Sequence, residues 1–236
     1  MKRRWSEGGT FLSALQGCAM RTADFRVTLF FPLLLGCFAL PPRAKEKENA
    51  DPLQLYRSGR VREAIAVSQA KLREEPENLS IYEVLCWALI EDGKYAEAER
   101  CAEEALKIDR HSDRAIESLA EAKFSLGKND EALLLFEEYI GLIPAAAAYR
   151  TRVPAAYYFM GEIYIRQARY HHANAALSTA VRIDQNRALW WTRLGYAREM
   201  LREYTGSLAA YDKALELDPS WVDAKNGRTR VSSQIR

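Results

Sequence analysis

A spacing of 34 residues recurs through most of the chain and constrains its fold more than any other feature. The clearest unit is ALWWTRLGYAREMLREYTGSLAAYDKALELDPSW, residues 188–221. Units with the same arrangement of small, aromatic and aliphatic residues begin at positions 79, 113 and 154. A single unit of two helices cannot bury its apolar face, so about three or more units must stack to form a core.

The residues that carry the pattern in the last unit are Trp191, Leu194, Gly195, Ser207, Tyr211 and Pro219. This pattern resembles the tetratricopeptide repeat, in which W-x₂-L-G-x₂-Y is followed by A-x₃-F and a proline. Arg198 departs from it at the tyrosine position. The resemblance implies an all-α fold, a right-handed α-solenoid of stacked helix pairs in which small residues such as Gly161 let helices approach.

The resemblance also divides the chain into units. It predicts repeats at residues 79–112, 113–146, 154–187 and 188–221, and a degenerate repeat at 51–78 whose first helix is cut short by Pro52. Residues 147–153 are an insert that either lengthens a helix or its loop, or alters the curvature of the solenoid. Residues 222–236 predict a polar capping helix over the last repeat.

The first 50 residues have a different character. The stretch VTLFFPLLLGC, residues 27–37, is too short to span a bilayer but suits the apolar part of a signal peptide. Its ending resembles the lipobox of bacterial lipoproteins, which implies a leader over 1–36, lipidation of Cys37, a tether over 37–50 and a periplasmic place in the cell envelope. The alternatives are a cleaved signal without lipid and a short uncleaved anchor. Met20 is a candidate start codon.

In this family the first helix of each unit lines a concave groove. Carried onto this chain, those positions predict partner-binding side chains at Glu83, Trp87, Ile90, Glu91, Glu117, Glu121, Phe124, Tyr158, Glu162, Arg166, Tyr196 and Glu199. The set is aromatic and acidic, which favours a protein or peptide partner with basic or apolar anchors. The alternative is that several of these residues form only a solvated face or pack under the N-terminal or C-terminal helix. The Lys and Asn with which chaperone-binding members hold a carboxylate are replaced here, among others by Trp87, which disfavours an acidic chaperone tail.

The sequence offers little for catalysis or for cofactors. His171 and His172 are adjacent, so on a helix they point about 100° apart and do not form a two-ligand metal face. Neither a phosphate-binding loop nor a nucleophile elbow is found in the sequence. Cys86 and Cys101 are predicted to be two buried thiols, with a disulfide as the alternative in an oxidising compartment. We therefore expect neither an enzyme nor a bound cofactor or metal.

The charge balance argues against nucleic acid as a partner. The formal net charge is +2, and outside residues 1–36 it is −1, which leaves no general phosphate-binding surface. The sequence therefore predicts a membrane-tethered scaffold for envelope assembly, secretion or a transporter-associated complex. The alternative is a small-molecule or lipid carrier that uses an apolar groove or an oligomeric pore, supported by Trp87, Phe124, Ile165 and Met200. The oligomeric state stays open.

Overall fold

The computed structural model describes residues 50–235, without the side chains of Tyr149 and Arg150. The leader, Cys37 and the tether lie outside the described residues. Within residues 50–235 the chain forms eleven α-helices, one 3₁₀ helix and no strand. These are α2 (Pro52–Arg57), α3 (Val61–Glu74), α4 (Leu79–Glu91), α5 (Tyr95–Ile108), α6 (Asp113–Ser125), α7 (Asn129–Leu142), η1 (Ala145–Arg150), α8 (Val153–Arg166), α9 (Tyr170–Ile183), α10 (Ala188–Met200), α11 (Tyr204–Leu217) and α12 (Val222–Ser232).

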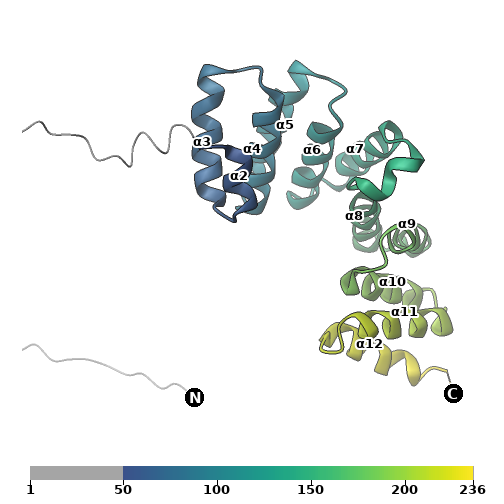
Figure 1. The fold of residues 1–236 in the computed structure, drawn as a ribbon. Coiled ribbons are helices and arrows are strands. Elements are labelled where there is room, and N and C mark those ends of the chain that lie inside the picture. Colours follow the sequence, from purple (N-terminus) through teal and green to yellow (C-terminus); the bar gives the residue numbers. More distant parts are fainter. Residues whose placement is uncertain (1–49, 236) are drawn as a thin grey trace, which may run out of the picture. The chain divides into compact units, whose positions relative to one another are not determined.

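The helices follow one another as packed pairs, α2 with α3, α4 with α5, and so on to α11, and α12 packs on α10 and α11 (Figure 1). Small residues at the contacts let the paired helices approach. A Cβ added at Gly161 would lie 2.5 Å from Leu177, and one added at Gly195 would lie 2.8 Å from Tyr211. The predicted all-α solenoid of helix pairs is confirmed.

Each pair is closed by a three-residue turn whose middle residue has a left-handed backbone. Glycine fills this place in the first three pairs, with φ of +75° at Gly59, +76° at Gly93 and +78° at Gly127. In the last two pairs the same place is taken by Ala168 and Arg202, with φ of +55° and +61°. A side chain with a Cβ is strained in this region, so these two turns keep the geometry against the local preference of the residue.

Helix α2 is only six residues long and begins at Pro52. Proline is tolerated there because its missing N–H would have no partner in the first turn of a helix. The side chain of Asp51 caps the helix by accepting a hydrogen bond from the backbone N–H of Leu53 at 3.1 Å. The N-terminal unit is therefore a short helix packed on a full one.

A ten-residue connection joins α7 to α8, where the other pairs are joined by four residues. The extra residues form η1 and leave α7 at 14 residues, the length of α5, α9 and α11. Across this connection the ring of Phe159 lies 4.9 Å from that of Phe124 and stacks on Phe136 at 5.5 Å. The inserted residues thus extend the connection, and aromatic packing holds α6, α7 and α8 together beside it.

A buried charged cluster joins α5, α6 and α7. The ammonium group of Lys123 lies 2.8 Å from a carboxylate oxygen of Glu99 and 2.6 Å from one of Glu131. Lys128 also donates to Glu99, at 2.6 Å. Hydrogen bonds from Lys123 and then Lys128 hold the pKa of Glu99 below its ordinary value. The core between the second and third pairs therefore contains an ion-pair network as well as apolar contacts.

The C-terminal helix α12 seals the apolar end of the last pair. Ala224, Gly227 and Val231 form its buried side. At Gly227 the helix comes so near to Tyr211 that an added Cβ would lie 2.2 Å from Cζ of the ring. Among the residues described, none of the helices has the length and apolar character needed to cross a membrane.

Candidate interaction surface

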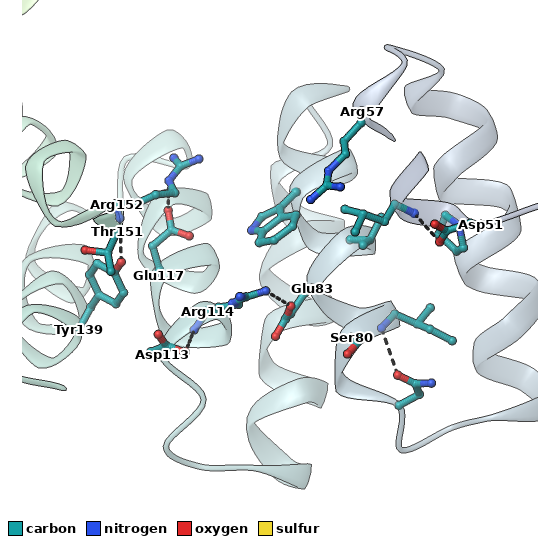
Figure 2. A pocket seen from close by; sticks show the side chains of 16 residues that line it. Asp51, Arg57, Ser80, Glu83, Asp113, Arg114, Glu117, Tyr139, Thr151 and Arg152 are labelled. Carbon is teal, nitrogen blue, oxygen red and sulfur yellow. Dashed lines mark hydrogen bonds and ion pairs between the residues drawn. The ribbon is translucent and has the colours of Figure 1, made fainter. Parts of the chain in front are cut away.

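The even-numbered helices α2, α4, α6, α8, α10 and α12 form a surface that we call the first-helix face. Two pockets open on it. A pocket of about 660 Å³, here called the Trp87 pocket, is lined mainly by α2, α4 and α6 and is bordered by Thr151 and Arg152 (Figure 2). A second pocket of about 500 Å³ is lined mainly by α8, α10 and α12. The first-helix face is therefore hollowed at both ends of the stack.

Ion pairs run along this face from one first helix to the next. Glu83 of α4 pairs with Arg114 of α6 at 2.5 Å. Glu162 of α8 accepts from Arg193 of α10 at 2.8 Å. In each pair the arginine follows the glutamate by 31 residues, one helical turn short of the 34-residue repeat.

The last pair of this series involves α12. Arg230 donates to both carboxylate oxygens of Glu199, at 2.8 and 2.9 Å, and again follows it by 31 residues. The hydroxyl of Tyr211 donates to the same carboxylate at 2.7 Å. Burial alone would raise the pKa of Glu199, but the hydrogen bonds from Arg230 and Tyr211 hold it below its ordinary value. Glu199 thus fastens the capping helix.

At the inserted connection one arginine serves two acids. Nε of Arg152 lies 2.7 Å from Glu117, and an Nη nitrogen lies 2.6 Å from Glu121. Arg152 is the N-cap residue of α8, and its backbone N–H donates to the hydroxyl of Tyr139 at 3.1 Å. The 31-residue spacing from Glu121 is kept, so the inserted residues place this arginine before α8 instead of within it.

Glu117 is the most deeply buried acid of this face, with 4% of its surface exposed. Burial raises the pKa of its carboxyl to about 7; Arg152 acts in the opposite direction, and the neighbouring Glu121 raises it further. A carboxyl group in these surroundings changes its charge near neutral pH.

These ion pairs show that most of the predicted acidic residues already have a partner within the chain. Glu83, Glu117, Glu121, Glu162 and Glu199 are each held by an arginine of the same chain. Each of these carboxylates is thus at least partly neutralised within the chain, and the preference for a partner with basic or apolar anchors stays a prediction. Of the predicted acids, Glu91 alone is exposed, and it lies at the hydroxyl of Tyr56.

The predicted aromatic and apolar positions divide into two groups. Tyr158 stacks on Trp190 with 5.5 Å between ring centroids, and burial raises its pKa to about 12. Phe124 lies under the guanidinium of Arg166, 4.1 Å from it. Arg166 also donates to the carbonyl of Phe124 and to Asn129, both at 3.3 Å. Tyr158, Phe124 and Arg166 therefore join helices to one another.

The second group is nearer to solvent. Trp87 is half-buried in the Trp87 pocket, between Tyr56 at 6.1 Å and the guanidinium of Arg114 at 5.8 Å. Ile90 packs against the core beside it. Tyr196 is half-buried and meets the edge of Tyr170 at 6.4 Å. Trp87 lines one pocket, and Tyr196 lines the other together with Tyr158, so these are the aromatic side chains of the predicted set that a partner can reach.

Comparisons with known proteins agree with this architecture. Two family models, both described as tetratricopeptide repeat, match the chain, one at residues 55–122 and 89–151 and the other at residues 158–220. The chain belongs to the tetratricopeptide-repeat family.

Solved structures similar to this tetratricopeptide-repeat protein share its fold at low identity. Pseudomonas aeruginosa pilF is 13% identical with a TM-score of 0.68, covering 78% of this chain and 81% of its own. A MamA protein is 20% identical with a TM-score of 0.58, covering 71% of this chain and 88% of its own. YrrB, described as having an unusual peptide-binding site, is 16% identical with a TM-score of 0.59, covering 71% of this chain and 83% of its own.

A curated relative matches only in part. RNA polymerase II-associated protein 3 of Xenopus tropicalis is 24% identical over 141 residues, which are 60% of this chain and 20% of that protein. The tetratricopeptide-repeat chain therefore spans about a fifth of the length of the curated relatives it matches.

The arginines that organise the first-helix face were not among the predicted site residues. Arg57, Arg152 and Arg193 were not predicted as site residues, and Arg230 was expected only as a polar residue of the capping helix. Arg57 lines the Trp87 pocket, and the other three arginines hold the acids. A signal was available, because a glutamate followed by an arginine 31 residues later recurs four times. Arg198, which departs from the repeat pattern, also has a structural role, since it donates to Asn174 at 3.1 Å and to the carbonyl of Gly206 at 3.2 Å.

The remaining candidate groups are placed as follows. His171 and His172 are exposed, and no cluster of three potential metal ligands occurs among the described residues. Cys86 and Cys101 are buried and free, and contact with the Cys101 thiol together with burial raises the pKa of the Cys86 thiol. Phe124 and Ile165 are half-buried and pack against the core.

Proposed function

We propose that this tetratricopeptide-repeat protein is a non-enzymatic scaffold that holds a partner protein or peptide on its first-helix face. The fold is that of a protein–protein interaction scaffold. The observation that carries the choice of face is that the two pockets described above open there, with Trp87 at one and Tyr196 at the other. Half-buried aromatic side chains on rigid helices are typical binding anchors.

The finer part of the proposal concerns location. The apolar stretch ending at Cys37 supports a lipid-anchored protein on the periplasmic side of a bacterial envelope, where it takes part in envelope assembly, secretion or a transporter-associated complex. Replacement of Cys37 by alanine is expected to remove the lipid mass and to release the protein from membranes. Unchanged mass and unchanged membrane association would refute the lipid anchor and leave the scaffold proposal standing.

Co-purification from solubilised membranes tests the scaffold. The tagged wild type is compared with a Trp87→Ala/Tyr196→Ala variant and with Leu134→Ala, a matched control on α7 whose side chain is 69% exposed. Circular dichroism establishes that all three are folded. We expect a partner that is retained by wild type and Leu134→Ala and lost from the double variant. A partner lost only from Leu134→Ala would move the site to the second helices, and a partner absent from all three would refute the proposal.

A further inference from the structure

We propose that Cys86 of α4 and Cys101 of α5 form a disulfide when the chain meets a disulfide oxidant, so that the second helix pair is closed by a covalent bond. The structure describes the reduced form, in which both thiols are free and buried. The proposal concerns the packing of one pair and does not depend on which face binds a partner. Cys86 directly precedes Trp87, so the bond would fix the helix that carries this anchor.

The two sulfur atoms meet at one turn of α4. Sγ of Cys101 lies 3.7 Å from the backbone carbonyl oxygen of Tyr82. A helical side chain leans toward the N-terminus of its helix and covers the preceding turn, which for Cys86 is the turn that contains Tyr82. The two thiols accordingly share a side-chain hydrogen bond. Contact between the sulfurs is the first requirement for a disulfide, because the S–S bond is only about 2 Å long.

The second pair has room for both sulfurs because it lacks the large residue that fills the same place in the later pairs. The equivalent residues of those pairs are fully buried, namely Phe136, Leu177 and Tyr211. In α5 the matching residue is Ala102. Cys86 takes the position of Gly161 and Gly195, where an added Cβ would touch Leu177 or Tyr211. The thiols of Cys86 and Cys101 therefore occupy the space between the two helices of this pair.

The surroundings of the thiols suit a structural disulfide better than a reactive thiolate. The hydrogen bond with Cys101 and then burial raise the pKa of the Cys86 thiol, and Glu83 and Glu117 act in the same direction. Nucleophilic cysteines of low pKa lie beside cationic groups or helix N-termini, whereas two acids act on this thiol. The pair is thus expected to be inert once it is bonded.

The oxidation is a thiol–disulfide exchange in two steps. Cys101 is 7% exposed and Cys86 only 1%, so the oxidant reaches Cys101 first. The Cys101 sulfur attacks one sulfur of the oxidant, the S–S bond of the oxidant breaks, and the released thiol takes up the proton of Cys101. The Cys86 sulfur then attacks the Cys101 sulfur, and the second oxidant thiol leaves with the proton of Cys86. The chain loses two hydrogen atoms and the oxidant gains them.

The exchange is expected before α4 and α5 have packed together, because burial keeps an oxidant away from the folded pair. Few residues separate the two cysteines, so the entropic cost of bringing them together is small. The oxidant is a disulfide, either a small molecule such as oxidised glutathione or the active-site disulfide of a dithiol oxidoreductase. The periplasmic location proposed above would supply one, since disulfides form and persist in that compartment.

Redox equilibration in native buffer and in urea tests the proposal. The full chain carries Cys18→Ser and Cys37→Ser, so that only Cys86 and Cys101 can pair. Unfolded protein is transferred into mixtures of reduced and oxidised glutathione, either in native buffer or in concentrated urea, and free thiols are then alkylated. Trypsin without reductant releases residues 74–94 and 101–107 as two peptides, and mass spectrometry measures the fraction in which they are linked.

We expect the equilibrium constant for the bond to be at least about tenfold larger in native buffer than in urea, because the folded pair holds the sulfurs in contact. By the same linkage, the oxidised protein should unfold at a higher urea concentration than the reduced protein. Absence of the linked peptides in native buffer would overturn the proposal. An equilibrium constant in native buffer equal to or smaller than that in urea would also overturn it.

Cys86→Ala in the same background is the control variant. Ala120 fills the equivalent position of the next pair and is fully buried there, so alanine suits this place in the fold. The unfolding midpoint of Cys86→Ala should be the same with oxidised and with reduced glutathione. A midpoint raised by oxidised glutathione in Cys86→Ala as much as in the parent chain would show that another reaction stabilises the protein, and would contradict the proposal.

Discussion

Arg152 and Glu117 are joined by an ion pair of 2.7 Å that connects α6 to the N-cap of α8 across the inserted connection. The carboxylate is buried and the arginine is half-exposed, so the pair turns its positive end toward the Trp87 pocket. The same orientation is repeated along the first-helix face. An acidic row of sequence positions thereby becomes a surface of guanidinium groups.

The stability of the protein should depend on the protonation of Glu117. Its pKa is raised to about 7 in the folded chain, mainly by burial, and the ordinary value is 4.5. The folded state therefore binds more protons than the unfolded state between these values, and stability falls as pH rises through this window. Relative to Glu117→Gln, we expect the wild type to lose roughly 1–3 kcal/mol between pH 4.5 and 7.5.

Urea unfolding of both proteins at several pH values measures this difference. Glu121, Asp113 and Arg152 surround the same carboxyl, and all three are retained in Glu117→Gln. Glu137→Gln, which changes an exposed acid of α7, is the control. If the stability of wild type and of Glu117→Gln changed with pH in parallel, the raised pKa of Glu117 would be contradicted.

The left-handed turns allow a stabilising substitution. Ala168 adopts φ of +55° where earlier pairs have glycine, and the strain of a Cβ in this region is about 1 kcal/mol. Ala168→Gly should therefore stabilise the protein by about 0.5 kcal/mol after the greater freedom of glycine in the unfolded chain is subtracted. Gly93→Ala, the reverse change at the matching position, should destabilise it by about 1 kcal/mol. The midpoint of thermal unfolding is measured for both variants. A shift of the same sign for Ala168→Gly and Gly93→Ala would contradict the preference of this turn position for glycine.

The buried charges between α5 and α7 predict a large effect from one lysine. Lys123→Met leaves the buried carboxylate of Glu99 with Lys128 alone. Loss of one partner of a buried ion pair typically costs 3–5 kcal/mol, and the remaining lysine should reduce this to about 2 kcal/mol. Chemical denaturation measures the loss, and the double variant Lys123→Met/Glu99→Leu should recover part of it. An unchanged midpoint for Lys123→Met would show that the network contributes nothing.

Attachment of the capping helix depends on the absence of a side chain at Gly227. Because an added Cβ would lie 2.2 Å from the ring of Tyr211, Gly227→Ala should displace α12 and destabilise the protein by about 2 kcal/mol. Gly141→Ala is the matched control, since nothing lies within 4 Å of a Cβ there. Hydrogen exchange should show faster exchange confined to α11 and α12 in Gly227→Ala. Protection equal to that of wild type would contradict the packing argument.

The fold could be predicted from the sequence because its signals are local and repeated. Small residues such as Gly161 and Gly195, and large ones such as Tyr211, occupy equivalent positions that helix packing fixes in each repeat. A 34-residue spacing of these residue types therefore implies helix pairs. The shape of the inserted connection was left open, because residues such as Ala147 and Ala148 suit a longer helix as well as a 3₁₀ turn.

The site could be predicted less well because its interactions join different repeats. Reading one helix at a time treats Glu91 and Glu117 alike, whereas the structure exposes the first and buries the second. The burial of Glu117 depends on residues of the next unit, here on Arg152, and Arg152 belongs to no sequence motif of the repeat. The pairing of acids with arginines 31 residues further on follows from stacking geometry and becomes visible only when successive first helices are aligned.

Site-specific photo-crosslinking in intact cells tests the central claim most directly. The photoreactive residue p-benzoylphenylalanine is placed in the full chain at Ser80, an exposed and uncharged residue at the Trp87 pocket, or at Leu134 on the second helices. The account predicts a discrete crosslinked partner from position 80 and none from position 134. A partner crosslinked from position 134 and not from position 80 would contradict the first-helix face as the binding surface.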